Sequence, residues 1–264
     1  MKWVLGTVSY LNAVPLVWSL ERRADVELVR LLPSQLGERL ERGELHASLS
    51  PVYDVLSGIG EAILGDAIVG ATREVRSVLL FYRGPLREMR SVALDASSHS
   101  SVNLLRVLLR DFYRIEPTFC DAAPDLDAML AQHDGALLIG DPALEAAQRA
   151  GEWRVLDLAR AWHDFTRQSF TFAAWSSRRD LPDEAARELA ALLNEARDEG
   201  VRSIDAIVEA NPTRSPLHAA IRRSYLTDAI QYRFSPSHQA GLREFARHLH
   251  RPFPRLISPC QKPT

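Results

Sequence analysis

The stretch SVALDASSHSSVNLLRVLLRDF, residues 91–112, contains the pattern that decides the fold. Its first four residues predict a short strand, and a loop rich in serine follows. A helix is predicted after the loop because apolar residues recur there at helical spacing, at Leu104, Leu105, Leu108, Leu109 and Phe112. A strand that leads through a loop into a helix is the repeating unit of an α/β protein.

The same alternation extends on both sides of this unit. Short apolar runs predict strands at residues 3–8, 26–32, 45–49, 75–82, 136–139 and 170–175. Helices are predicted at residues 33–43, after Gly140, and over 182–200, 201–211, 216–230 and 235–249. Strands that alternate with helices predict an α/β fold with mostly parallel sheets.

The middle of the chain carries its own strand–helix units, whereas the two flanking segments lack a complete set unless they join each other. We therefore expect a discontinuous lobe I, residues 1–84 and 170–264, and a lobe II, residues 85–169. The chain would cross between them near residues 82–86 and 170–175. Two crossings permit closure around a ligand, so we expect a cleft between the lobes.

Composition excludes several classes of protein. The 264 residues hold 32 Lys and Arg against 34 Asp and Glu, a balance that argues against nucleic acid as a partner. Cys120 and Cys260 are the only cysteines, so we expect free thiols in a reducing compartment and no metal site. No apolar run is long enough for a membrane span or a secretory signal, which predicts a cytoplasmic protein without a membrane partner. The oligomeric state stays open.

The serine-rich loop is the strongest functional signal. Ser97, Ser98, Ser100 and Ser101 lie at the predicted N-terminus of a helix, where free N–H groups and the helix dipole favour an anion. His99 is the only histidine in a candidate binding loop. Capping by a single serine is the simpler explanation of the loop, although it needs only one hydroxyl.

Further polar residues follow other predicted strands. Ser9, Tyr10 and Asn12 come after the first strand, where they form either a second part of the site or an ordinary turn. Ser50 and Ser77 are weaker candidates, because a buried serine often bonds only to backbone.

Asp141 is predicted as the N-cap of its helix, with Pro142 at the first helical position. The glycine-rich motifs of phosphate loops and dinucleotide sites are absent, as is the nucleophile elbow of hydrolases. We therefore expect no nucleotide, flavin or other cofactor.

Six stretches, in this order, resemble the chorismate dehydratases of the futalosine route to menaquinone. They read VSYLNAVPL, LSPVYDVL, EVRSVLLF, LDASSHSSVNLL, LLIGDPAL and YLTDAIQYRF, and they span residues 8–234. The resemblance implies a two-lobed fold like that of type II periplasmic binding proteins. It also implies that chorismate, a dicarboxylate, loses its C3 proton and C4 hydroxyl to give 3-[(1-carboxyvinyl)oxy]benzoate and water.

The resemblance implies catalytic roles for Asn12 and Ser77. It implies that the substrate is bound by Ser9, Tyr10, Ser50, Ser98, His99, Ser100, Ser101 and Asp141. Three positions depart from the family pattern. TRQSF at residues 166–170 replaces an expected TGLPF, so that either the backbone differs or Arg167 reaches the substrate; His99 replaces a threonine or basic residue; and His46 replaces an aspartate in what we interpret as a structural position.

The sequence leaves two candidates for the base that removes the C3 proton. Asp141 serves if it faces the cleft. Otherwise the enolpyruvyl carboxylate of the substrate takes the proton while Asn12 orients it, which we favour because Asp141 already has a predicted capping role; Asn12 itself is no candidate, since a neutral amide is scarcely basic. Two other functions also stay open: the dihydroxynaphthoate synthase of the same pathway, and a solute-binding module without catalysis.

Overall fold

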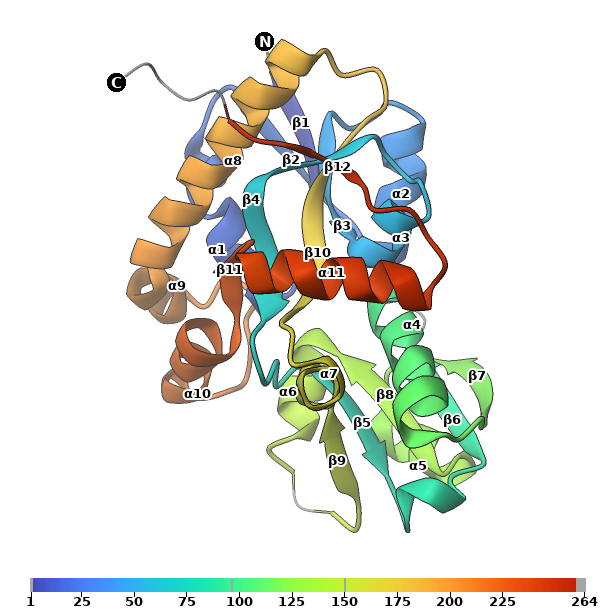
Figure 1. Cartoon of the computed structure of the whole chain (residues 1–264). Helices are drawn as coiled ribbons and strands as arrows, with labels where there is room; N and C mark the ends of the chain where they lie inside the picture. Colours follow the sequence, from blue (N-terminus) through green and yellow to red (C-terminus); the bar gives the residue numbers. More distant parts are fainter. Residues whose placement is uncertain (1, 96, 150, 260–264) are drawn as a thin grey trace.

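The chain was analysed as a computed structural model that describes residues 2–95, 97–149 and 151–259. Its strands form two separate sheets (Figure 1). The larger sheet has the strand order β11-β4-β10-β3-β1-β2, with β12 beside β4. Its strands are β1 (Trp3–Thr7), β2 (Val26–Arg30), β3 (Ala47–Pro51), β4 (Ala62–Ala71), β10 (Phe170–Ser177), β11 (Gln231–Arg233) and β12 (Arg255–Ile257).

The second sheet has the order β7-β6-β8-β5-β9. Its strands are β5 (Val78–Tyr82), β6 (Ser91–Asp95), β7 (Thr118–Ala122), β8 (Gly135–Ile139) and β9 (Arg154–Asp157). We call the part of the chain around the larger sheet lobe I and the part around the second sheet lobe II. In Figure 1 the two lobes lie one above the other.

Helices cover both sheets (Figure 1). Those of lobe I are α1 (Val14–Val17), α2 (Pro33–Glu41), α3 (Val52–Leu56), α8 (Asp183–Arg202), α9 (Ile204–Ala210), α10 (Ala219–Ser224) and α11 (Pro236–His248). Those of lobe II are α4 (His99–Val107), α5 (Leu126–Gln132), α6 (Gly140–Ala146) and α7 (Leu158–Thr166). α4 and α10 each continue into a π-helical turn, over Leu108–Tyr113 and Tyr225–Ala229.

The sheets are more mixed than the strand–helix alternation predicts. β1 pairs in parallel with β2 and β3, and β6 pairs in parallel with β7 and β8, as expected. β10, however, is antiparallel to β3 and β4, and β5 is antiparallel to β8 and β9. The reason is the route of the chain, because β5 and β10 each enter their sheet from the other lobe and therefore run against strands that end at the cleft.

The position of β5 corrects the predicted lobe boundary. Residues 78–82 were expected in lobe I, but β5 lies in the second sheet. The first crossing therefore lies between β4 and β5, at residues 72–77, and the second lies between α7 and β10. Each crossing holds one arginine in the left-handed region, Arg76 at φ 59° and Arg167 at φ 62°. The Asp157 carboxylate accepts the N–H groups of Val75 (3.0 Å) and Arg76 (2.7 Å), and so fixes the first crossing to the start of α7.

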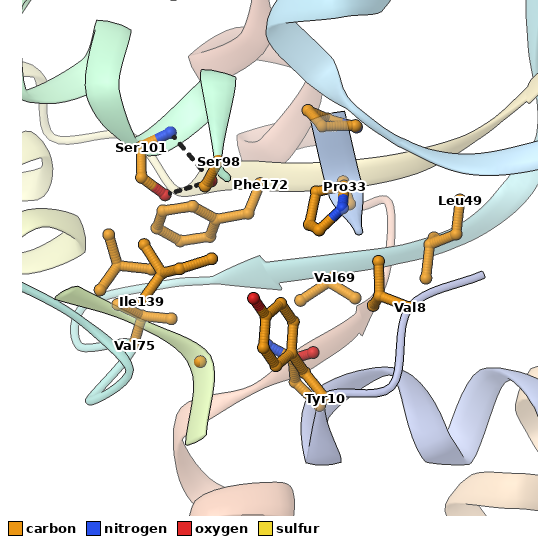
Figure 2. Close-up of a pocket in the computed structure, with 15 residues that line it drawn as sticks. Val8, Tyr10, Pro33, Leu49, Val69, Val75, Ser98, Ser101, Ile139 and Phe172 are labelled. Atoms are coloured by element: carbon orange, nitrogen blue, oxygen red, sulfur yellow. Dashed lines mark hydrogen bonds between the residues drawn. The ribbon is translucent and has the colours of Figure 1, made fainter. Parts of the chain in front are cut away.

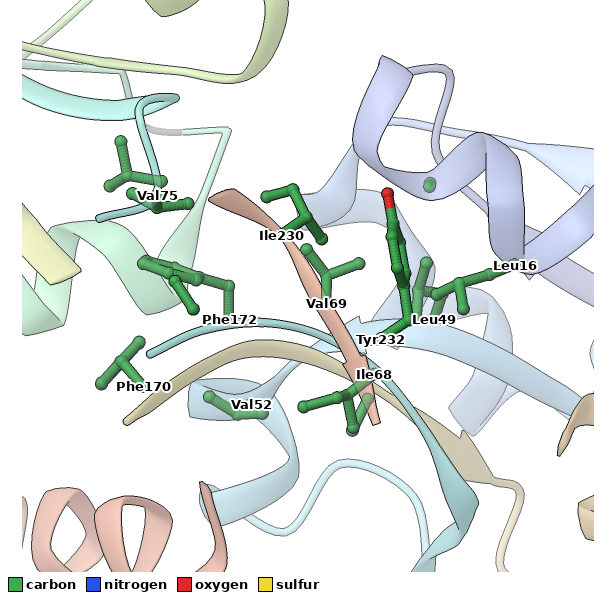
Figure 3. Packing of buried hydrophobic residues seen from close by; sticks show 14 of the residues in the cluster. Leu16, Leu49, Val52, Ile68, Val69, Val75, Phe170, Phe172, Ile230 and Tyr232 are labelled. Atoms are coloured by element: carbon green, nitrogen blue, oxygen red, sulfur yellow. The ribbon is translucent and has the colours of Figure 1, made fainter. Parts of the chain in front are cut away.

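An aromatic core supports the strands that meet the cleft. Trp162 of α7 packs edge-on against Phe170 of β10 and Phe245 of α11, with ring centroids 5.5 and 6.0 Å apart. Figure 3 shows Phe172 beside Val69, on the neighbouring strand β4. Burial of such large apolar side chains is the dominant favourable contribution to folding, so the cleft ends of β4 and β10 are firmly held.

Across the described ranges, no helix combines the length and the apolar character that crossing a membrane requires.

Candidate functional site

A pocket lies between the lobes, where strands and loops of both sheets meet. It encloses about 560 Å³ of empty space, part of which is open to solvent. Much of the wall is apolar, with Val69 and Phe172 from lobe I and Ile139 from lobe II. Figure 2 shows Tyr10 on one side and Ser98 and Ser101 on the other. The polar side chains of the lining are those of Tyr10, Asn12, Ser98 and Ser101.

The serine loop forms the lobe II side of this pocket. Ser98 is the N-cap of α4, because its Oγ accepts the N–H of Ser101 at 3.4 Å. The Ser98 hydroxyl also donates to the Ser101 hydroxyl at 2.8 Å. The predicted cap and the predicted binding loop are therefore the same residues, since both serines line the pocket while Ser98 caps the helix.

The neighbouring residues of the loop turn toward lobe I instead. The buried Ser100 Oγ accepts the N–H of Tyr53 in α3 at 3.1 Å. His99 Nδ1 lies 2.7 Å from the carboxylate of Asp54, which raises the pKa of His99. Neither residue is part of the pocket lining, and both make contacts between the lobes.

The loop after β1 provides the opposite side. Tyr10 and Asn12 line the pocket, whereas Ser9 is exposed and lies outside the lining. The Tyr10 ring packs directly on Gly140: a Cβ atom at position 140 would lie 2.8 Å from the Tyr10 ring, and Gly140 has φ +60°. Glycine tolerates both conditions, so this contact between lobes depends on it. Burial raises the pKa of the Tyr10 phenol, so it stays a neutral donor at the cleft.

Asp141 does not cap its helix, so that prediction is wrong. The N-cap position of α6 is Ile139, and Asp141 lies inside the first turn. Its carboxylate reaches across the lobes and accepts the N–H of Leu11 at 3.1 Å. Burial raises its pKa to about 6. Asp141 therefore anchors the loop that carries Asn12, and its neighbour Gly140, not Asp141, is part of the lining.

Ser50 and Ser77 lie behind the pocket rather than in its lining. The Ser50 hydroxyl is buried and bonds to that of Ser48 at 2.6 Å. Ser77 is buried as well, and its carbonyl accepts the N–H of Gly140 at 2.7 Å. Its hydroxyl accepts from Tyr225 at 2.7 Å. Tyr225 was not among the predicted site residues, and its place in the matching stretch YLTDAIQYRF was the one signal that could have pointed to the site.

The departures at Arg167 and His46 are both structural. Arg167 is exposed at the C-terminal end of α7 and lies outside the pocket lining. His46 Nδ1 accepts the N–H of Val4 at 3.0 Å, and its ring packs edge-on against Trp3. His46 therefore joins β1 to the start of β3.

The chemistry of the pocket is that of neutral hydrogen-bond donors. Among the residues that the structure describes, no lysine or arginine lines it. No group of three histidine, cysteine, aspartate or glutamate residues that could hold a metal occurs within residues 2–95, 97–149 and 151–259. Hydroxyls, an amide and a helix N-terminus suit an oxygen-rich anion, and the apolar wall suits a hydrocarbon ring.

Comparison with known proteins gives close matches in sequence and in fold. A family model described as menaquinone biosynthesis matches residues 3–251. A chorismate dehydratase from Thermus thermophilus is 32% identical over 273 residues, which cover 97% of this chain and 98% of that protein.

Two solved structures show the same architecture. The periplasmic aliphatic sulphonate-binding protein SsuA from Escherichia coli has a TM-score of 0.65 at 19% identity, over 94% of this chain and 91% of its own. A Candida albicans protein described as having the generic periplasmic-binding-protein fold has a TM-score of 0.64 at 12% identity, over 100% of this chain and 99% of its own. These matches confirm the predicted periplasmic-binding-protein-like fold.

The family model spans both lobes and every residue of the pocket, and the Thermus thermophilus protein matches over nearly the same range. The chain therefore belongs to the menaquinone biosynthesis family.

Proposed function

We propose that this protein is a chorismate dehydratase, a lyase that converts chorismate to 3-[(1-carboxyvinyl)oxy]benzoate and water. The observation that carries the proposal is the pocket itself. It places Asn12 and Tyr10 opposite the serine-lined N-terminus of α4, within a chain that matches a named chorismate dehydratase over nearly its whole length. The six stretches that resemble the family contribute most of this lining.

The substrate fits the chemistry of the lining. Chorismate carries two carboxylates and one hydroxyl on a ring without charge. The hydroxyls of Ser98 and Ser101, at a helix N-terminus, suit one carboxylate, and Asn12 suits the other. The apolar wall formed by Val69, Ile139 and Phe172 suits the ring. The product ring is aromatic and uncharged, and it would pack against the same apolar wall.

The substrate itself supplies the base in this proposal. The enolpyruvyl carboxylate takes the C3 proton, the electrons of the C–H bond form the new ring double bond, and the C4–O bond breaks. The departing hydroxide takes this proton from the carboxyl group and leaves as water, so that the carboxylate is regenerated and atoms and charge balance. A carboxylate positioned beside the proton gains a large effective molarity, which compensates for its weak basicity.

The described part of the chain places no cationic side chain in the lining, which supports this choice of base. A lysine or arginine beside the carboxylate would lower its pKa and weaken it as a base. A largely apolar wall disfavours the charged form of a carboxylate and so strengthens it as a base. Asp141 is the other candidate, since its pKa of about 6 suits a base, but its carboxylate is engaged with the Leu11 N–H.

We further propose that the lobes close on the substrate about the crossings at residues 72–77 and 167–169. The contacts between Asp141 and Leu11, and between Ser100 and Tyr53, join lobe II to lobe I beside the pocket. A cytoplasmic location is part of this proposal, because the exposed free thiol of Cys120 suits a reducing compartment.

Incubation of the purified protein with chorismate tests the function. Chromatography with mass detection should show chorismate replaced by an aromatic acid that is lighter by one water. Turnover of cyclic dehypoxanthine futalosine, with chorismate unchanged, would instead assign the dihydroxynaphthoate synthase activity. Tight binding of chorismate without any product would assign a solute-binding module.

A further inference from the structure

The turn that carries Asn12 begins with a backbone N–H that the turn itself cannot satisfy. It is a single 3₁₀ turn, Leu11–Ala13, and its first backbone bond runs from the Ala13 N–H to the Tyr10 carbonyl at 3.0 Å. The N–H of Leu11 precedes that bond, so its acceptor must come from outside the turn. The side chain of Tyr10, at the N-cap position, packs on Gly140 instead of capping the turn (Figure 2).

Asp141 of lobe II supplies this acceptor. Its Oδ1 atom accepts the Leu11 N–H at 3.1 Å, although the two residues lie 130 positions apart in the chain. A side-chain oxygen that accepts an N–H at the start of a helical turn acts as a cap. Asp141 was predicted to cap its own helix, and in the structure it caps a turn of the other lobe.

The capped residue is the immediate neighbour of Asn12. Leu11 and Ala13 are buried in the core of lobe I, whereas Asn12 between them lines the pocket. The core holds the side chains on both sides of Asn12, and the bond to Asp141 holds the backbone one residue before it. The place of the Asn12 amide in the pocket therefore depends on contacts from both lobes.

Asp141 makes this contact at a cost to the stability of the fold. Burial raises the pKa of Asp141, the Leu11 N–H opposes the rise, and the neighbouring carboxylate of Glu145 adds to it. An asparagine would accept the same N–H without a charge to bury, but more weakly, because a charged acceptor makes the stronger hydrogen bond. A carboxylate at this position fits a residue whose role is to hold the turn firmly.

We propose that Asp141 is a positioning residue that caps the Asn12 turn across the cleft, and so fixes the Asn12 amide against the substrate carboxylate only while the lobes are together. This inference rests on the proposed dehydratase function. Asp141 lies outside the lining and acts on the substrate through Asn12. Because the acceptor and the turn belong to different lobes, closure of the lobes and assembly of the site are a single event.

Two substitutions at position 141 test the proposal, since Asp141→Ala removes the acceptor and Asp141→Asn keeps one. We expect Asp141→Ala to lower kcat for chorismate roughly 10- to 100-fold, because a catalytic group displaced by about 1 Å costs about that much, while KM changes by about threefold or less. Asp141→Asn should recover at least about fivefold of this loss, because its amide oxygen accepts the Leu11 N–H.

Glu145→Ala is the matched control. It removes the other carboxylate of α6 and leaves the bond between Asp141 and Leu11 in place, so kcat and KM should stay as they are. Thermal unfolding shows whether each variant is folded. Should Asp141→Ala fold poorly, Asp141→Leu fills the same space without an acceptor and must show the same loss of kcat.

A double-mutant cycle shows whether the loss is transmitted through Asn12. Adding Asp141→Ala to Asn12→Ala should lower kcat no further. Losses that multiply, or an unchanged kcat in Asp141→Ala, would overturn the proposal while turnover by the wild type upholds the dehydratase. Equal loss of turnover in Asp141→Asn and Asp141→Ala would also overturn it, and would make the carboxylate itself the base. A wild type that does not turn over chorismate would overturn both this proposal and the proposed function.

Discussion

Replacement of Asp141 by asparagine should stabilise the protein, and the gain should depend on pH. Burial raises the pKa of this carboxyl from its usual 3.8 to about 6. The folded chain therefore binds the proton more tightly than the unfolded chain does. The free energy of unfolding falls as the pH rises from about 4 to about 6, and the loss stays constant at higher pH. Asparagine has nearly the same shape and no charge to bury.

The size of the effect follows from the pKa. A rise of about two pKa units corresponds to about 3 kcal/mol, and partial access of solvent to the side chain lowers this to about 1–3 kcal/mol. The amide oxygen of asparagine can still accept the Leu11 N–H, so the contact between lobes persists. For a chain of this size, 1 kcal/mol raises Tm by roughly 2–4 °C.

Thermal unfolding of the wild type and Asp141→Asn from pH 5 to pH 8 measures this directly. The difference in Tm should grow between pH 5 and pH 7 and then level off. Asp121→Asn, which removes an exposed carboxylate of β7, controls for the change in net charge and should shift Tm little. A variant that is no more stable than the wild type at pH 8, or a gain that is the same at every pH, would refute this reasoning.

The same variant distinguishes the two candidate bases. If the substrate carboxylate takes the proton, Asp141→Asn should keep kcat within about tenfold of the wild type. Normal binding of chorismate combined with complete loss of turnover would make Asp141 the base.

Four further substitutions test the contacts around the pocket. The raised pKa of His99 means that its ionic bond to Asp54 is fully present below the ordinary histidine pKa near 6.5 and is lost as the pH rises through the raised value. Calorimetry should therefore show tighter binding of a dicarboxylate analogue at pH 6 than at pH 8. In His99→Asn, the affinity should differ less between these two pH values. Gly140→Ala places a methyl group against the Tyr10 ring at positive φ and should destabilise the protein by about 1–3 kcal/mol; an unchanged Tm would contradict the close packing of the lobes. Ser98→Ala and Ser101→Ala should each weaken analogue binding by about 1–3 kcal/mol, and normal affinity in both would reduce the loop to a helix cap.

Local patterns in the sequence predicted many of the elements and several site residues. The serine loop does stand between β6 and α4, and Tyr10, Asn12, Ser98 and Ser101 do meet in one pocket. These features depend on neighbours in sequence: a strand end, a helix N-terminus and the loop between them. The carboxyl ends of parallel strands meet at one edge of a sheet, so the loops that follow β6 and β8 come together, and the loop that follows β1 of the other sheet meets them at the pocket.

Features that depend on segments far apart in the sequence, or on an irregular strand, could not be predicted from local patterns. β4 was missed because Gly65, Asp66 and Gly70 break the alternating pattern of its ten residues. The antiparallel direction of β10 follows from the crossing, which no local pattern records. Asp141 looked like a cap because it precedes a proline at the start of a helix; its actual partner, the Leu11 N–H, is 130 residues away in the sequence.

Asn12→Ala tests the central claim most directly. The measurement is the rate at which the wild type and this variant form 3-[(1-carboxyvinyl)oxy]benzoate from chorismate. The wild type should form this product, and Asn12→Ala should form it about 100-fold more slowly or worse while its Tm stays close to that of the wild type, because the pocket then has no amide to orient the substrate carboxylate. A wild type that forms no product, or an Asn12→Ala variant that forms it at the wild-type rate, would contradict the account.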